Sequence, residues 1–244
     1  MIDKHANDKI MALLGFCAGN SPLVVEMAKD ALGIHKFDVV KNIAVDIPEK
    51  FLNWKDIEIQ VLTSENYSFN KSEPEIHFGV LDAHVKYVLY HYFYINHGLG
   101  KNRYTNIIHP TAYFAGSSEH GKGFILDPLC VVSTKSNIGF GVTVKRSSSV
   151  GHHAEISDFV TINPGATVSG NVQIGEGTTI GAGAIINHNI TIGKYSMIGS
   201  GSVVTKDIPD GVVAFGNPCR VVRKFERWDK SFDTVRSFSD SSIE

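Results

Sequence analysis

Two adjacent histidines, His152 and His153, are the residues of this 244-residue chain whose type and spacing most clearly suggest chemistry. Imidazole titrates near neutral pH and can therefore take a proton from a reacting group. His188 follows 36 residues after His152, a spacing that gains meaning once the repeat period of the chain is known. Because surface histidines are usually only solvated, these residues need positioning elements before they indicate a site.

A second candidate lies near the N-terminus. Residues 9–15 read KIMALLG and predict a buried strand, which is followed by a loop at residues 16–21 and a helical pattern through residue 32. A strand, a turn of small residues and a helix form the arrangement by which α/β domains offer backbone N–H groups to a phosphate. The loop lacks a full GxGxxG pattern, so a tight structural turn is the alternative to nucleotide binding.

Composition excludes several classes of function. The formal net charge is −2 without a basic stripe, which argues against a nucleic-acid or acidic-membrane partner. Cys17, Cys130 and Cys219 form neither a disulfide framework nor a CxxC metal motif, as is typical of a reducing compartment. The apolar run at residues 10–17 is too short to span a membrane, and no targeting segment is apparent. We therefore expect a cytoplasmic protein without membrane insertion.

A repeat with a period of six residues dominates the chain from residue 108 onward. Sixteen of the seventeen residues in this register are apolar, which has a chance probability on the order of 10⁻⁵ at average composition. The register comprises Ile108, Phe114, His120, Leu126, Val132, Ile138, Val144, Val150, Ile156, Ile162, Val168, Ile174, Ile180, Ile186, Ile192, Ile198 and Val204. His120 is the exception, and we expect it to be a hydrogen-bonded core histidine near the first coil.

This period predicts a solenoid with three short flat sides, because it matches neither an amphipathic helix nor an isolated strand. Glycine often follows the apolar residue, as at Gly139 and Gly175, and a small residue comes four positions after it, as at Ala154 and Ala166. Three sides make a coil of 18 residues, so five to six coils at ~4.8 Å spacing would form a prism roughly 27 Å long. His152 and His153 follow the inward Val150 and are expected to point outward at a turn.

The residues before the prism predict a small α/β domain. Strands are expected at residues 39–47, with Asp46 near the end, at 56–63 and at 75–80, which contains Gly79. Residues 85–95 predict an aromatic-rich helix, and residues 97–102 a connection between domains. We expect a nucleotide-binding domain with linker helix at 1–105, the prism at 106–215 and a tail at 216–244 with a short helix.

The order of α/β domain, His-Pro-Thr-Ala at 109–112, hexapeptide coils and Gly-Asn-Pro-Cys-Arg at 216–220 resembles one family. It is similar to the bacterial sugar acetyltransferases, left-handed β-helix hexapeptide-repeat acyltransferases that N-acetylate nucleotide-linked amino sugars or O-acetylate sialic acid. The resemblance covers nearly the whole chain. It implies an α/β N-terminal domain with a small Rossmann-like parallel sheet, followed by an all-β left-handed parallel β-helix.

The resemblance also implies the base. The family has a histidine followed by an acidic residue, another histidine nine residues after the first, and then I-x-P-G-A; the matching stretch here is residues 152–166, HHAEISDFVTINPGA. His152 takes the position of the general base, which would accept a proton as an amine or hydroxyl attacks a thioester carbonyl. His153 replaces the acidic neighbour, a role for which Glu155 or Asp158 could substitute, and Thr161 replaces the histidine that contacts the cofactor.

Further site residues follow from the resemblance alone. The implied cosubstrate is acetyl-CoA, and no metal is expected. Its binding residues would be Thr161, Ala182 and Ser200 along the pantetheine, and Lys206, Gly216 and Arg220 near the adenine and phosphates. The sugar nucleotide would contact Ala18, Gly19, Asn20, Asp46 and Gly79. A homotrimer with active sites between adjacent prisms is also implied.

Three alternatives stay open at this point. Sugar O-acetylation is the nearest, and a binding or scaffold protein that has lost the base is the second. The third is a metalloenzyme, because the γ-class carbonic anhydrases share this fold and bind zinc through three histidines. Two of these would match His152 and His188, but the third ligand is expected where this chain has Gly193, and a catalytic zinc needs three protein ligands.

Overall fold

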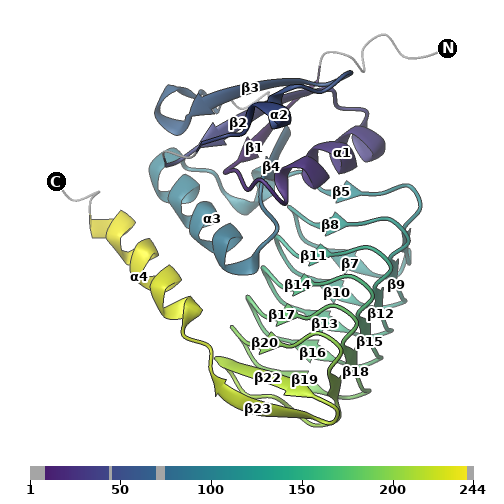
Figure 1. Ribbon diagram of the computed structural model, residues 1–244. Helices are drawn as coiled ribbons and strands as arrows, with labels where there is room; N and C mark the ends of the chain where they lie inside the picture. The colour runs from purple at the N-terminus through teal and green to yellow at the C-terminus, as the bar shows by residue number, and fades with distance from the viewer. Residues whose placement is uncertain (1–8, 44–45, 70–74, 241–244) are drawn as a thin grey trace.

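In the computed structural model, which describes residues 9–43, 46–69 and 75–240, a small α/β unit lies at one end of a three-sided prism (Figure 1). The unit contains strands β1 (Ile10–Leu14), β2 (Lys36–Lys41), β3 (Glu58–Thr63) and β4 (Glu75–Phe78) and helices α1 (Ser21–Leu32), α2 (Glu49–Leu52) and α3 (Ala83–His97). The four strands are parallel in the order β3-β2-β1-β4. The chain order reverses between β1 and β4, which is where open α/β sheets place their ligands.

The sheet is buried on both sides. Alternate residues of its strands point to opposite faces, and helices cover each face. Met11 and Leu13 pack in the cluster that contains the residues of α1, whereas Ala12 and Leu14 pack in the cluster that contains those of α3. Both clusters also take in residues of the prism, including Ile107 in the first. The unit is therefore joined to the prism through continuous apolar packing.

The prism has three faces, each a sheet of parallel strands that are two residues long. The first face contains β5 (Ile107–Ile108), β8 (Ile125–Leu126), β11 (Thr143–Val144), β14 (Thr161–Ile162), β17 (Thr179–Ile180) and β20 (Met197–Ile198). The second contains β6 (Tyr113–Phe114), β9 (Val131–Val132), β12 (Ser149–Val150), β15 (Thr167–Val168), β18 (Ile185–Ile186) and β21 (Val203–Val204). The third contains β7 (Glu119–His120), β10 (Asn137–Ile138), β13 (Glu155–Ile156), β16 (Gln173–Ile174) and β19 (Thr191–Ile192).

The predicted register is confirmed: its residues from Leu126 to Val204 are all buried in one cluster along the axis. Small residues fill the corners, and several corner hydroxyls bond to a backbone carbonyl 15 residues later. Examples are Ser136 to Gly151 at 2.8 Å and Thr178 to Gly193 at 2.7 Å. These bonds satisfy hydroxyl groups that burial would otherwise leave unpaired.

Three edges separate the faces, and two of them matter for function. The first edge, between the first and second faces, comprises residues 109–112, 127–130, 145–148, 163–166, 181–184 and 199–202. The second edge, between the second and third faces, comprises residues 115–118, 133–136, 151–154, 169–172, 187–190 and 205–208. Equivalent positions of successive coils stack in columns along each edge.

Several elements differ from the sequence-based expectation. Strand β2 covers Lys36–Lys41, because Phe37, Val39 and Val40 are the residues that its sheet buries. The strand predicted at 39–47 thus begins earlier and ends by residue 41, and its residues 44 and 45 lie outside the described residues. Beyond residue 210, β22 (Val212–Gly216) and β23 (Cys219–Lys224) form an antiparallel hairpin that extends the first face. The tail is then a helix of 14 residues, α4 (Arg227–Asp240), which returns to pack along α3 (Figure 1).

The prediction for His120 is wrong in one respect. Its ring stacks with Phe124 at a centroid distance of 5.4 Å, and its Nδ1 lies 3.2 Å from the amide nitrogen of Asn106. The side chain is nevertheless exposed, since β7 is the terminal strand of the third face and no further coil covers its inward side.

Candidate active site

His152 and His153 lie together on the second edge, between β12 and β13, and both are exposed. Their Nδ1 atoms are 3.0 Å apart, so one ring must donate the hydrogen bond and the other must accept it. When His152 donates through Nδ1, its Nε2 is unprotonated and can accept a proton from a reacting group. The pair therefore offers one oriented imidazole with a free nitrogen.

The same corner position is occupied in neighbouring coils by residues that surround His152. Gly170 stands one coil further along, and a Cβ atom there would lie 2.5 Å from Nε2 of His152. His188 follows in the next coil, with its ring centroid 6.3 Å from that of His152 and the planes inclined by 38°. Lys206 occupies the same column beyond it. Among the described residues, no group of three His, Cys, Asp or Glu side chains is arranged to hold a metal ion.

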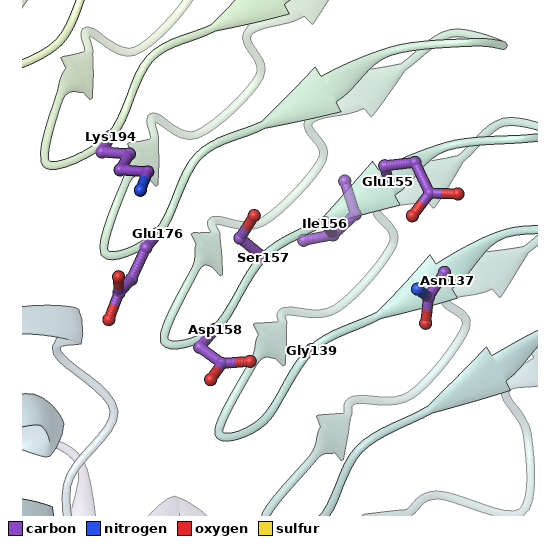
Figure 2. A pocket seen from close by; sticks show the side chains of 8 residues that line it. All are labelled: Asn137, Gly139, Glu155, Ile156, Ser157, Asp158, Glu176 and Lys194. Atoms are coloured by element: carbon purple, nitrogen blue, oxygen red, sulfur yellow. The ribbon is translucent and has the colours of Figure 1, made fainter.

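The acidic residues considered as partners of His152 lie elsewhere. Asp158 is at the edge between the third and first faces, where it binds Lys101 at 2.5 Å and the backbone N–H of Phe140 at 2.7 Å. Glu155 lies on the third face, in a shallow hollow of about 350 Å³ that Asp158, Glu176 and Lys194 also line (Figure 2). His153, and not a carboxylate, is the hydrogen-bond partner of His152.

The residues expected along a pantetheine chain do not lie beside His152. Ala182 and Ser200 occupy equivalent exposed positions on the first edge, in successive coils, next to corner glycines such as Gly181 and Gly199. This part of the first edge is therefore lined mainly by backbone. Thr161 lies on the first face and is 3% exposed, and its hydroxyl donates to the carbonyl of Leu81 at 3.2 Å. Its hydroxyl group belongs to the joint between the prism and the α/β unit.

Two polar residues that sequence reasoning missed, Lys145 and Asn163, lie on the first edge closer to the α/β unit than Ala182 and Ser200. The ammonium of Lys145 lies 3.1 Å from Oδ1 of Asn163. Desolvation lowers the pKa of Lys145, and the nearby carboxylates of Asp82 and Asp127 oppose that effect. Asp82 in turn accepts a hydrogen bond from the side-chain amide of Asn20 at 3.3 Å. The charge effect of Asp82 on Lys145 and its hydrogen bond with Asn20 indicate that the loop after β1 lies near the first edge. A corner column in which Lys145 and Asn163 stand 18 residues apart was the available signal.

The loop between β1 and α1 differs from a simple phosphate cradle. At the start of α1, the N–H of Ser21 binds the carbonyl of Cys17 at 2.8 Å, and residue 22 is a proline, which has no N–H. The helix N-terminus thus has few free donors. Ala18 and Gly19 are exposed, and their amides make no hydrogen bond with the described part of the chain. They are the remaining donors for an anion.

The other two residues predicted to contact the nucleotide, Gly79 and Asp46, lie in different parts of the α/β unit. Gly79 is buried, and the close approach of the Gly15 carbonyl leaves no room for a Cβ atom at Gly79. Its backbone carbonyl accepts a hydrogen bond from Ser21 Oγ at 2.6 Å. Asp46 is exposed in the loop after β2.

Between these loops lies an apolar hollow of about 300 Å³ that sequence reasoning did not identify. Ala18 borders it. Phe16, Pro22, Pro48, Lys50, Phe51 and Trp54 complete the lining. The indole N–H of Trp54 donates to the carbonyl of Phe51, so the ring presents its apolar surface. Phe16 in the loop after β1, Phe51 on α2 and Trp54 just after α2 are the sequence signal for this hollow.

The last group of predicted residues lies at the far end of the prism. Gly216 ends β22 with φ +109°, and Arg220 on β23 donates to the carbonyl of Cys219 at 2.8 Å. Lys206 lies on the second edge near the same end.

Among the described residues, no helix is long and apolar enough to cross a membrane.

The comparisons agree with this architecture. The family model "bacterial transferase hexapeptide (six repeats)" matches residues 171–206, which lie within the prism. No curated protein matches the sequence. Among solved structures, the acetyltransferase domain of PglB from Neisseria gonorrhoeae, in complex with acetyl coenzyme A, is 28% identical with a TM-score of 0.74. That match covers 88% of this chain and 100% of the domain.

Two further structures share the fold. WeeI from Acinetobacter baumannii is 21% identical with a TM-score of 0.69, over 88% of this chain and 99% of its own. A variant of perosamine N-acetyltransferase from Caulobacter crescentus, in complex with CoA and GDP-perosamine, is 20% identical with a TM-score of 0.69, over 88% and 96%. Because each match covers more of the chain than the prism alone, it also includes part of the α/β unit. The chain thus contains hexapeptide repeats of the bacterial transferase type and is similar over most of its length to the acetyltransferase domain of PglB.

Proposed function

We propose that the protein is an acetyl-CoA-dependent N-acetyltransferase that acts on the amino group of a nucleotide-linked amino sugar, with His152 as general base. The observation that carries this proposal is the likeness to the PglB acetyltransferase domain bound to acetyl coenzyme A, which extends over both the prism and the α/β unit. The oriented imidazole of His152 on the second edge supplies the proton acceptor that such a transfer requires.

The reaction needs no covalent enzyme intermediate. The amine of the sugar attacks the thioester carbonyl carbon, and Nε2 of His152 takes the proton that the nitrogen loses. The tetrahedral intermediate carries its negative charge on oxygen, where a backbone N–H group of a neighbouring coil can stabilise it. Collapse of the intermediate breaks the carbon–sulfur bond, and the proton held by His152 passes to the departing CoA thiolate. The products are the N-acetylated sugar and free CoA.

The arrangement of the edges favours a homotrimer. His152 is on the second edge, whereas Ala182 and Ser200, the proposed pantetheine contacts, are on the first. A single chain therefore does not bring its own base to the proposed cofactor groove. The second face between the two edges exposes Tyr113 and Ile185, which are 58% and 43% exposed, and such apolar surface suits contact with another copy. In the proposed trimer, the second edge of one copy meets the first edge of the next.

The other proposed contacts with CoA lie along the same groove, between the second edge of one copy and the first edge of the next. Lys206, Gly216 and Arg220 would lie near the adenine and phosphates of CoA, at the far end of the prism. Thr161 is a weaker candidate for cofactor contact, because its hydroxyl already donates to Leu81.

The acceptor is proposed to bind at the other end of the groove. The free amides of Ala18 and Gly19 suit its phosphates, with Asn20 following them in the same loop and Asp46 as a further proposed contact from the loop after β2. Gly79 contributes by allowing the close backbone packing at this loop. The aromatic hollow that Ala18 borders would accept the base of the nucleotide.

Incubation of the purified protein with acetyl-CoA and a panel of UDP-, dTDP- and GDP-linked 4-amino sugars tests the proposal. Release of the CoA thiol should require both substrates and should fall about 10²- to 10⁴-fold in the His152→Ala variant, while CoA binding is retained. Turnover only with hydroxyl acceptors would replace the N-acetyltransferase by an O-acetyltransferase. CoA binding without turnover on any acceptor would instead indicate a non-catalytic protein.

A further inference from the structure

We propose that Gly170 is a positioning residue for His152, because its missing side chain provides the space in which the imidazole lies. The inference rests on the proposed function only in so far as His152 is the base. The spatial relationship itself concerns the two residues and can be measured without any substrate.

The geometry places the reactive side of the imidazole against Gly170. A Cβ atom on Gly170 would lie 2.5 Å from both Nε2 and Cε1 of His152, and 3.0 Å from Cδ2. Non-bonded heavy atoms normally approach only to about 3.5–4.0 Å. Any side chain at residue 170 must therefore displace the ring by roughly 1 Å.

The turn itself does not require glycine at this position. The left-handed backbone conformation of the corner is adopted by the next residue, Asn171, with φ +56°. Residues with full side chains, such as Thr134 and His188, occupy the equivalent position in other coils. Gly116, also at that position, has nothing within 4 Å of an added Cβ atom. The contact with His152 is thus what distinguishes Gly170.

The imidazole is held on its other sides as well. His153 fixes Nδ1 at 3.0 Å, and the ring of His188 stands one coil beyond Gly170 with its centroid 6.3 Å from that of His152. A methyl group at residue 170 would push the ring away from the edge, which would stretch the bond to His153 and move Nε2. The backbone amide of residue 170 would remain in place.

Two matched variants test this positioning, Gly170→Ala and Gly116→Ala. We expect Gly170→Ala to lower kcat about 100-fold, the loss typical of a 1 Å misplacement, with an unchanged KM for acetyl-CoA. Gly116→Ala should behave as the parent. In ¹H NMR spectra, the Hε1 signal of His152, identified by its loss in His152→Ala, should shift in Gly170→Ala and stay in place in Gly116→Ala.

A second variant and a double mutant distinguish displacement of His152 from a general folding defect in Gly170→Ala. His188→Ala should also shift the His152 signal, because it removes a neighbouring ring. Adding Gly170→Ala to His152→Ala should cause no further loss of kcat, since the residue to be positioned is absent. An unmoved His152 signal in Gly170→Ala would overturn the proposal, as would a raised KM for acetyl-CoA with unchanged kcat. A shifted signal in a protein without transferase activity would support the positioning and refute the proposed function.

Discussion

Lys86 is a buried lysine that should make the stability of this protein depend on pH. It lies on α3, is 1% exposed, and its ammonium donates to the carbonyl of Gly141 at 2.5 Å and to Oγ1 of Thr143 at 2.8 Å. Both acceptors are neutral; Thr143 lies on the first face of the prism and Gly141 at the edge just before it. Burial, and to a smaller extent the nearby Lys145, lower the pKa of Lys86 from its ordinary value of 10.5 to about 7, and Asp82 opposes this lowering.

The sign of the effect follows from proton binding. Between pH 7 and 10.5 the unfolded chain holds the proton of Lys86 and the native protein has released it, so the free energy of unfolding rises with pH in this window. The pKa change corresponds to about 5 kcal/mol in total, at 1.36 kcal/mol per pKa unit. From pH 7 to pH 9 the expected gain in stability is about 2 kcal/mol.

Lys86→Met removes the titrating group and keeps a side chain of similar length. We expect urea unfolding of the parent to gain about 2 kcal/mol more between pH 7 and pH 9 than unfolding of the variant, at equal protein concentration. Lys122→Met, at an exposed lysine of the prism, is the matched control and should follow the parent. Equal pH dependence of the parent and Lys86→Met would refute the assignment of a lowered pKa to this lysine.

Three further predictions concern the site and the joint between units. His153→Ala should lower kcat by at least about tenfold, and by less than His152→Ala, because it removes the orienting hydrogen bond but not the base; steady-state kinetics with unchanged KM values checks this, and an unaffected kcat would argue against the pair. We also expect Lys145, whose pKa is influenced by Asp82 next to the proposed nucleotide loop, to contact the sugar nucleotide. Lys145→Met should then raise the KM for the sugar nucleotide about 10- to 100-fold, the range for a lost hydrogen bond to a charged group; a raised KM for acetyl-CoA instead would refute this assignment. Gly79→Ala should destabilise the protein by about 1–3 kcal/mol or more, because the added methyl meets a backbone carbonyl, and urea unfolding should show Gly116→Ala within about 0.5 kcal/mol of the parent.

The prism could be predicted almost residue by residue because its period is enforced by packing. Each coil has one inward position per side, and an axis too narrow for polar groups admits only apolar residues there, as Val150, Ile156 and Ile162 illustrate. His120 escaped this rule because it lies in the terminal coil, where one side is open to solvent. Periodicity indicates which side a residue faces but does not indicate where the stack ends.

The candidate site was harder to predict, because it depends on contacts between segments distant in sequence. The corner position of His152 followed from the register, but its partner could not, since His153 and the carboxylates at residues 155 and 158 were all within reach along the chain. The charge of Asp82 acts on Lys145 because α3, which Asp82 precedes, docks against the prism through Lys86. Such docking is stabilised by many apolar contacts between distant segments, and a local sequence motif does not indicate them.

The N-terminal loop shows the same limit. A strand, a loop of small residues and a helix were recognisable, yet the start of α1 is closed by the bond from Ser21 to Cys17 and by Pro22. The aromatic hollow beside it combines residues of the loop after β1 and the start of α1 with residues of α2 and the loops that flank it. Only the folded sheet brings those loops together.

The most direct test of the central claim is transfer of a labelled acetyl group from acetyl-CoA to a nucleotide-linked 4-amino sugar, followed by mass spectrometry of the product. We predict one added acetyl group on the sugar nitrogen, formed by the parent and lost in His152→Ala. Acetylation that persists at the parental rate in His152→Ala, or an acetyl group found only on oxygen, would contradict the account.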